Sequence, residues 1–460
     1  MKIILLSGGS GKRLWPLSND SRSKQFLKIL KSDSGNYESM VQRVLRQLKQ
    51  NGLAKDSYVT TSKGQYETIQ SQLGNDISII VEPETRDTFP AIALSALFLY
   101  EKEQVSLDET VIVMPVDPYV ESEFFSKVSE LEHILDLSKA ELALIGVKPV
   151  LPSEKYGYIV PLRSCSEENY SLVDRFVEKP SERVASELIS QGALWNCGVF
   201  AFRLEYIINA LDRLDLPLKY GHLKNHYSDL PKISFDYQVV EKAEKIVVTE
   251  FDGNWKDLGT WNTLTEEMDT QKIGNVILSE ECTNTHVINE LDIPIAVIGV
   301  SNMVVAASPD GLLVTDKEAS PRIKEVMKNH YSRPMYEERR WGHYKILDYS
   351  KQLNGKEILT KKIQIKEGMN LSYHSHQNRN EVWTVTCGKG VLVVDGVSSF
   401  VEEDFFIQIP AGKKHSIKAL TDLEIIEIQS GSELTENDIE RDLYLWEEIE
   451  KHCFLSSKKP

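Results

Sequence analysis

The sequence predicts an α/β unit with a mostly parallel sheet, then a short β-rich connector, then an all-β unit at its C-terminal end. Apolar runs of strand length alternate with amphipathic segments up to Met268, which is typical of a parallel sheet covered by helices. From Asn275 to Val314 the helical patterns stop, and short runs rich in Val and Ile appear between polar breaks. The polar segment from Tyr331 to Arg340 contains a proline and is the best linker candidate, and the last unit opens at Trp341.

Length and charge limit the possible classes of protein. A chain of 460 residues is long for a single core, so we expect three units at residues 1–268, 269–330 and 331–445. The 53 basic and 69 acidic residues give a net charge of −16, which argues against a nucleic-acid partner and an anionic membrane surface. Cations that gather locally in such an acidic chain are therefore expected to bind a local anion.

Cysteine usage and hydropathy point to a cytoplasmic protein. The five cysteines are scattered and never form a Cys-x-x-Cys pair, so neither a disulfide framework nor a zinc ribbon is indicated. The amino-terminal apolar run is too short for a signal peptide or a membrane span, and no later segment approaches the length of a membrane helix. We therefore expect no membrane partner.

Periodicity predicts the elements of the chain in order. Lys2 to Leu6 is an apolar run of strand length, and Met40 to Gln50 has apolar residues at helical spacing. Further strands are expected at Ser57–Thr61, Ile77–Val81, Thr110–Met114 and Leu142–Val147. Further helices are expected at Gly64–Leu73, Ala91–Tyr100, Glu121–Leu137 and Ser320–Asn329.

A glycine-rich turn after the first strand predicts a phosphate site. Its small residues let backbone N–H groups approach an anion closely, and they are Ser7, Gly8, Gly9, Ser10 and Gly11. Lys12, Arg13 and Lys24 place positive charge beside the turn, and such a set can neutralise a triphosphate during phosphoryl transfer. The spacing fits neither a P-loop, because Arg13 follows Gly-Lys, nor G-x-G-x-x-G, because Leu14 stands at the last glycine position.

The same segment resembles the signature of the sugar-1-phosphate nucleotidyltransferases, GGxGxRLxPL followed by KQFL. Gly8 to Leu17 and Lys24 to Leu27 match it, with Lys12 where the family usually has Thr. The resemblance implies a Rossmann-like domain that takes a nucleoside triphosphate and a sugar phosphate. A surface turn in an ordinary α/β protein is the alternative reading.

Asp117 follows the strand Thr110–Met114. In an open α/β sheet, ligands bind at the carboxyl ends of strands, so this aspartate is expected to face the site opened by the glycine turn. It could instead simply begin a turn before the next helix. The resemblance implies that Asp117 and Asp257, the latter in a WxDxGxW element, hold Mg²⁺ together, and two carboxylates with substrate phosphates suffice for this ion.

The resemblance also implies roles for other residues. The loop containing Arg86 and Asp87 would contact the nucleotide base. The sugar would be bound by Gly157, Glu178 and Asn196, and its phosphate by Lys179. The catalytic set is then Arg13, Lys24, Asp117, Lys179 and Asp257.

A second constellation lies in the all-β unit. His374 and His376 point to one face of a strand, and Glu381 and His415 can reach the same point across a barrel. Three imidazoles and a carboxylate bind a divalent transition metal, such as Zn²⁺, and leave positions for substrate. Alternatively, these histidines could have a purely structural role, with their ring nitrogens hydrogen-bonded inside the domain. The spacing HxHxxxxE with a later PxGxxH resembles the two cupin motifs, which implies a cupin barrel.

Taken together, nearly the whole chain resembles the type II bifunctional mannose-1-phosphate guanylyltransferase/mannose-6-phosphate isomerases of bacterial polysaccharide synthesis. This family implies GTP and mannose 1-phosphate as substrates, and an isomerase site in which Arg379 lies near the sugar phosphate. His374 stands where that family generally has Gln. The connector is expected to pack or oligomerise rather than react, so we expect a homo-oligomer.

Two other functions stay open at this point. The first is a nucleotidyltransferase for another sugar 1-phosphate or base with a cupin that does not isomerise. It is motivated by the departures from the family pattern at Lys12, Asp87, Phe89, Pro118 and His374. The second is a sensor that binds nucleotide-sugars without turnover, and the joint retention of the five expected catalytic residues argues against it.

Overall fold

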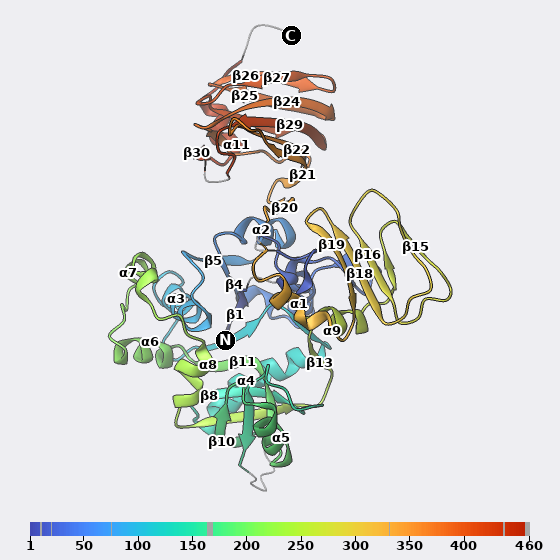
Figure 1. Cartoon of the computed structure of the whole chain (residues 1–460). Helices are drawn as coiled ribbons and strands as arrows, with labels where there is room; N and C mark the ends of the chain where they lie inside the picture. The colour runs from blue at the N-terminus through green and yellow to red at the C-terminus, as the bar shows by residue number, and fades with distance from the viewer. Residues whose placement is uncertain are drawn as a thin grey trace.

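A computed structural model describes residues 1–9, 12–19, 21–74, 76–162, 169–330, 332–435 and 438–455. Figure 1 shows the sheet and helices of the first unit, a β-rich connector at its side, and an all-β unit formed by the last part of the described chain. No helix within the described ranges combines the length and the apolarity needed to cross a bilayer.

The first unit is built on a nine-stranded sheet. Its order is β5 (Ser78–Glu82), β4 (Ser57–Ser62), β1 (Lys2–Ser7), β6 (Thr110–Pro115), β11 (Leu194–Arg203), β8 (Leu142–Val147), β12 (Ile246–Phe251), β10 (Ser171–Val177) and β9 (Tyr158–Pro161). The parallel pairing expected for most of the sheet is found for β5, β4, β1 and β6, and for β8 with β12. The sheet is mixed, because β11 runs antiparallel to both β6 and β8, and β10 runs antiparallel to β12 and β9.

Helices cover both faces of this sheet. One apolar core packs α1 (Met40–Gln50), α2 (Tyr66–Leu73), α4 (Glu123–Ser138) and α5 (Glu182–Ser190) on one face. A second core packs α3 (Thr88–Glu101), α6 (Leu204–Arg213), α7 (Tyr220–Asn225) and α8 (Phe235–Gln238) on the other. Ile3, Ile4 and Leu5 of β1 are fully buried, as expected for a strand covered on both faces.

Short strand pairs complete the first unit. β2 (Leu30–Lys31) pairs with β3 (Tyr37–Glu38). β7 (Pro118–Val120) pairs antiparallel with β13 (Trp255–Asp257), and α9 (Trp261–Glu266) follows. The β7–β13 pair joins two segments far apart in the sequence beside the carboxyl end of β6.

The connector is β-rich, as its Val/Ile runs predict. β14 (Lys272–Ile273), β16 (His286–Asn289) and β18 (Met303–Ser308) pair in parallel, and β19 (Gly311–Asp316) closes the sheet antiparallel to β18. β15 (Val276–Leu278) pairs in parallel with β17 (Ile295–Val297). The helix expected at Ser320–Asn329 is much shorter: a 3-10 turn with a proline near its start leads into α10 (Ile323–Val326), where Ile323 is buried against Leu14 and its neighbours.

The last unit contains two six-stranded sheets around one apolar core. The first holds β20 (Tyr336–Arg339), β21 (Gly342–Lys351), β22 (Glu357–Ile365), β29 (Leu423–Gly431), β24 (Arg379–Cys387) and β27 (Phe406–Ile409). The second holds β30 (Glu440–Leu443), β23 (Tyr373–Ser375), β28 (His415–Ala419), β25 (Lys389–Val394), β26 (Val397–Glu402) and β31 (Phe454–Leu455), and α11 (Trp446–Lys451) lies beside it. Part of the segment expected to be a linker is strand β20, which lies against α2 of the first unit (Figure 1).

Candidate functional site

The structure brings Asp117, Asp257 and Lys24 together. Asp117 lies between β6 and β7, and Asp257 stands opposite Pro118 in the β7–β13 pair, so the two carboxylates are held by one short ladder. Lys24 Nζ lies 2.8 Å from Oδ2 of Asp117 and 2.6 Å from Oδ1 of Asp257. Three residues from distant parts of the sequence therefore form one ionic cluster.

The protonation of this cluster follows from its charges. Burial alone would lower the pKa of Lys24, but Asp117 and Asp257 outweigh it and raise that pKa above its usual value. Burial alone would likewise raise the pKa of Asp257, and the charges of Lys24 and Arg13 hold it below its usual value. Lys24 thus stays a cation and Asp257 an anion, and Arg13 is exposed but close enough to act on Asp257.

The side chains of Ser23 and Gln65 hold the glycine turn in place through hydrogen bonds, and no role was predicted for either residue from the sequence. Gly9 has φ +97°, and its carbonyl accepts hydrogen bonds from Ser23 Oγ at 2.8 Å and from Gln65 Nε2 at 3.1 Å. Gln65 Nε2 also lies 2.7 Å from Ser23 Oγ. No motif marks Gln65, because it acts through a tertiary contact. Ser10, Gly11 and the side chain of Lys12 lie outside the described residues.

A large cavity opens beside the turn. Its empty space is about 1930 Å³ with its mouth included, and its lining includes Ser7, Gly8, Gly9, Gln65, Asp87, Asp117 and Lys324. Asp87 begins α3 with φ 71°, and its carboxylate accepts a hydrogen bond from Thr88 N. Arg86 is not in the lining, because its guanidinium binds Glu84 and the carbonyl of Leu230. Lys324 comes from the connector, and no motif predicted it here.

A second cavity contains the residues expected to bind the sugar. It has about 740 Å³ of empty space, and its lining includes Lys24, Gly157, Glu178, Asn196, Asp236 and Asp257. A Cβ on Gly157 would lie 2.5 Å from Glu178 Oε2, so any other residue there would displace the side chain of Glu178. Asp117, Gly198 and Asp236 line both cavities, which therefore meet at the ionic cluster.

Charged groups surround the sugar cavity. Lys179 has φ 46° and pairs with the carboxylate of the buried Glu178, although Lys179 itself is not in the lining. Asn196 Nδ2 donates to Oδ1 of Asp236 at 2.9 Å. Burial and the nearby Glu178 raise the pKa of Asp236 to about 7, so this carboxyl is partly protonated near neutrality. A role for Asp236 was not predicted from the sequence.

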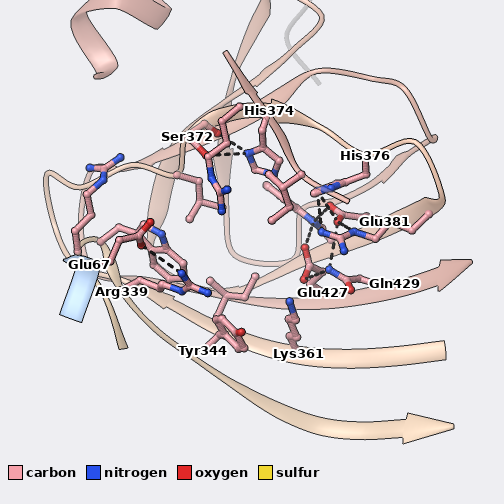
Figure 2. A pocket seen from close by; sticks show the side chains of 18 of the residues that line it. Glu67, Arg339, Tyr344, Lys361, Ser372, His374, His376, Glu381, Glu427 and Gln429 are labelled. Carbon is pink, nitrogen blue, oxygen red and sulfur yellow. Dashed lines mark hydrogen bonds and ion pairs between the residues drawn. The ribbon is translucent and has the colours of Figure 1, made fainter. Parts of the chain in front are cut away.

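The four residues expected to bind a transition metal also come together, in the all-β unit. His374 on β23 pairs in register with His415 on β28, and their ring centroids are 4.5 Å apart. The candidate ligand atoms of His374, His376 and His415 lie within 4.8 Å of one another. Oε1 of Glu381 lies 3.2 Å from His376 Nε2 (Figure 2). Oε2 of Glu381 lies 3.2 Å from His415 Nε2.

Backbone carbonyls orient the three imidazoles. Nδ1 of His374, His376 and His415 lies 2.7, 2.7 and 3.0 Å from the carbonyls of Ser372, Asp438 and Lys413. Each Nδ1 therefore carries the proton, which leaves Nε2 as the free ligand atom. Burial keeps the pKa of His374 well below its usual value and lowers that of His376 to about 4. Burial alone would lower the pKa of His415, but its contact with Glu381 outweighs burial and raises that pKa. Three buried imidazoles and a carboxylate this close together fit a divalent transition metal.

A network of polar side chains surrounds these ligands. Arg379 contacts Glu381 Oε1 through Nε and His376 Nε2 through Nη2, both at 3.2 Å. Trp383 Nε1 lies 3.1 Å from Glu381 Oε2 and 3.0 Å from Glu427 Oε1. Burial, then the charge of Glu381, raises the pKa of Glu427 to about 7. Glu427 was not predicted, although an inward-facing Glu in the alternating strand Leu423–Gly431 could have signalled it.

Three family models match successive parts of the chain. A family model described as nucleotidyl transferase matches residues 2–272, and one described as MannoseP isomerase/GMP-like beta-helix domain matches residues 275–329. A third, described as mannose-6-phosphate isomerase C-terminal, matches residues 324–442.

Relatives extend over nearly the whole chain. The xanthan biosynthesis protein XanB of Xanthomonas campestris is 30% identical over 475 residues, 95% of this chain and 97% of its own. A mannose-1-phosphate guanylyltransferase of Klebsiella pneumoniae is 30% identical over 481 residues, 95% of this chain and 98% of its own. The crystal structure of a mannose-1-phosphate geranyltransferase from Thermus thermophilus superposes with a TM-score of 0.58 at 29% identity, covering 71% of this chain and 98% of that one. The chain therefore belongs to the nucleotidyl transferase family, and its C-terminal part carries the mannose-6-phosphate isomerase C-terminal domain.

Proposed function

We propose that the first domain makes GDP-mannose and pyrophosphate from GTP and mannose 1-phosphate. The observation that carries this proposal is the cluster of Lys24, Asp117 and Asp257 at the junction of two cavities. The cavity beside the glycine turn suits a nucleoside triphosphate, and the one containing Gly157, Glu178 and Asn196 suits a sugar phosphate. The relatives that carry the name mannose-1-phosphate guanylyltransferase support this pair of substrates.

In the reaction, a phosphate oxygen of the sugar 1-phosphate attacks the α-phosphorus of the triphosphate, and pyrophosphate leaves in line. Lys24 and Arg13 neutralise charge on the triphosphate and on the leaving pyrophosphate. Lys179 fixes the attacking phosphate, and backbone N–H groups of the turn from Ser7 to Gly11, with Lys12 beside it, hold the triphosphate. Asp117 and Asp257 would hold Mg²⁺, which when bound supplies positive charge to the reacting phosphates.

The remaining assignments position the substrates. Gly157 lets the sugar approach the backbone, Glu178 accepts hydrogen bonds from its hydroxyls, and Asn196 offers its amide. Arg86 and Asp87 belong to the loop that contacts the base. Because the guanidinium of Arg86 is engaged with Glu84 and Leu230, its contribution to base contact is indirect in this arrangement.

We propose that the last domain is a cupin that interconverts mannose 6-phosphate and fructose 6-phosphate. His374, His376, Glu381 and His415 would hold Zn²⁺ or another divalent transition metal, which when bound polarises the sugar carbonyl. Arg379 orients Glu381 and His376 through its contacts, and is the residue that the family resemblance assigns to the sugar phosphate. We further propose that the chain is a cytoplasmic homo-oligomer. Its three units are residues 1–268, 269–330 and 331–445.

The test is pyrophosphate release by the purified chain with Mg²⁺, using GTP, ATP, CTP and UTP against mannose, glucose and fucose 1-phosphates. Release with GTP and mannose 1-phosphate alone is the expected result. Release with another pair would mean that residues such as Asp87, Phe89 and Pro118 reset the specificity. Binding of a nucleotide-sugar without turnover of any pair would overturn the enzyme assignment in favour of a sensor.

A further inference from the structure

The pocket of the cupin domain contains more positive than negative side chains. Its empty space, open mouth included, is about 660 Å³. Five permanent cations line it, namely Arg339, Arg340, Lys361, Arg379 and Arg441. Three carboxylates line it, namely Glu67, Glu381 and Glu427.

Three of the five cations are matched by the three carboxylates. Arg379 Nε lies 3.2 Å from Glu381 Oε1, and Arg339 Nη1 lies 3.8 Å from Glu67 Oε2. Lys361 is buried, and its charge acts on Glu427 by lowering that carboxyl's pKa against the larger effect of burial. Figure 2 shows Glu67 and Arg339 at one end of the pocket, and Glu381, Glu427 and Gln429 at the other.

Arg340 and Arg441 remain without a carboxylate in the part of the chain that the structure describes. Arg340 Nη2 donates to the carbonyls of Asn370 at 3.3 Å and Tyr444 at 3.0 Å, which anchors the guanidinium at the pocket and satisfies only one of its nitrogens. Arg441 is exposed, and no acidic partner is found for it among the described residues. Two guanidinium charges therefore face the pocket without a counter-ion.

Strand register places one of these charges beside the metal ligands. Arg441 on β30 pairs with His374 on β23, and directly paired residues of an antiparallel ladder send their side chains to the same face. One pocket therefore contains two of the imidazoles, those of His374 and His376, together with both unmatched arginines. A hexose phosphate has the same layout, with a neutral carbonyl end and a dianionic end.

We propose that Arg340 and Arg441 bind the phosphate of the hexose 6-phosphate. This inference rests on the proposed isomerase function of the cupin. The planar guanidinium group binds phosphate oxygens in pairs, and two such groups balance the two charges of a phosphate monoester. In an acidic chain with a net charge of −16, this local excess of positive charge attracts an anionic ligand into the pocket.

Arg379 is a positioning residue in this arrangement. Its side chain is buried, and all three of its nitrogens are engaged: Nε with Glu381, Nη1 with the carbonyl of Thr435 at 3.0 Å, and Nη2 with His376. A phosphate there would have to displace contacts that orient two of the expected metal ligands. The unmatched charge of Arg340 and Arg441 requires no such displacement.

The test is calorimetric binding of fructose 6-phosphate, fructose and inorganic phosphate to the full chain as purified. The variants are Arg340→Gln, Arg441→Gln and Arg379→Lys, and Lys389→Gln is the control because Lys389 is an exposed cation of the same domain outside the pocket. We expect the wild type and the control to bind fructose 6-phosphate more tightly than fructose. Arg340→Gln and Arg441→Gln should each lower the affinity for fructose 6-phosphate by about 10- to 100-fold and leave the affinity for fructose unchanged.

The outcomes separate this inference from the isomerase function. If the preference for the phosphorylated sugar depends on Arg340 and Arg441 but the chain does not interconvert the two hexose 6-phosphates, the phosphate site stands and the isomerase proposal fails. If only Arg379→Lys loses the preference, or if the wild type has none, the phosphate site is overturned. Arg441 is exposed, so Arg441→Gln carries the test even if Arg340→Gln does not fold, and Arg441→Lys should recover part of the affinity.

Discussion

Lys24 Nζ lies 2.6 Å from Oδ1 of Asp257, so a positive charge already occupies the place beside the carboxylates where Mg²⁺ is expected. If Asp117 and Asp257 hold Mg²⁺ as proposed, the ammonium group of Lys24 would compete with the ion for the same oxygens until substrate phosphates bind. Because phosphate oxygens offer Lys24 a second partner, nucleotide binding would draw it away from Asp257 and open the carboxylates to the ion.

Lys24→Gln should make these two roles separable. Removing the competing charge should tighten Mg²⁺ binding in the absence of nucleotide, while turnover should fall by about 100- to 1000-fold because charge on the triphosphate is no longer neutralised. Calorimetric Mg²⁺ titration and pyrophosphate release measure the two effects. Lys148→Gln, which removes an exposed surface lysine, is the matched control. Weaker Mg²⁺ binding by Lys24→Gln would contradict this account.

Gly157→Ala should damage sugar binding alone. The added methyl group would lie 2.5 Å from Glu178 Oε2 and 2.8 Å from Phe176, so the lining must shift. We expect KM for the sugar 1-phosphate to rise by about tenfold or more, with KM for the triphosphate unchanged. Gly221→Ala is the control, because a Cβ there has no neighbour within 4 Å. An equal rise in both KM values would place Gly157 in general folding rather than in the sugar site.

Asp236→Asn should change how stability depends on pH. The folded protein raises the pKa of Asp236 from 3.8 to about 7, so between these values the folded chain binds a proton that the unfolded chain has lost. This group therefore destabilises the folded state progressively as pH rises through that window. The melting temperature of Asp236→Asn relative to wild type should increase from about pH 5 to about pH 8. Calorimetric scans at both pH values measure it, and a constant difference would refute the assignment.

His374→Gln tests the imidazole that stands where the resembled family generally has Gln. Burial holds the pKa of His374 well below its usual value, and its Nδ1 is fixed by the carbonyl of Ser372, so Nε2 is ready as a ligand. The substitution should lower affinity for Zn²⁺ by about tenfold or more, since a ligand atom is lost. Metal content after dialysis at a defined free Zn²⁺ concentration measures it. His452→Gln, at an exposed histidine of the same domain, should retain metal as the wild type does.

Much of the fold was predictable because local patterns and packing agree. The helix Met40–Gln50 and the strand Leu142–Val147 were predicted with the observed bounds. In the first, apolar residues recur at helical spacing along its whole length, and the second is one uninterrupted apolar run. The direction of β11 was not predictable, because an antiparallel strand within the sheet is set by tertiary pairing. The helix predicted at Ser320–Asn329 proved shorter, because only its beginning has a buried partner.

The residues of the two candidate sites likewise fall into a group that the sequence predicted and a group that it did not. Motif spacing predicted the residues that the structure gathers around Lys24 and around His374, because those motifs each carry several groups at once. Gln65, Lys324, Arg340 and Glu427 were missed, because each acts from an element whose local pattern looks ordinary. Their positions depend on tertiary contacts, such as those of Gln65 with Gly9 and of Glu427 with Trp383.

Helix α2 and the residue before it contact both candidate sites. The residue before it, Gln65, holds the carbonyl of Gly9 in the nucleotide turn, and Glu67 in its first turn lines the cupin pocket. Further along the helix, Gln72 donates to Glu338 of β20 at 2.8 Å. The two domains therefore contact each other directly and are not joined by a linker alone. A cupin expressed alone from residue 331 would lack Glu67 in the lining of its pocket, and a separated transferase domain would expose the face of α2 that now contacts β20.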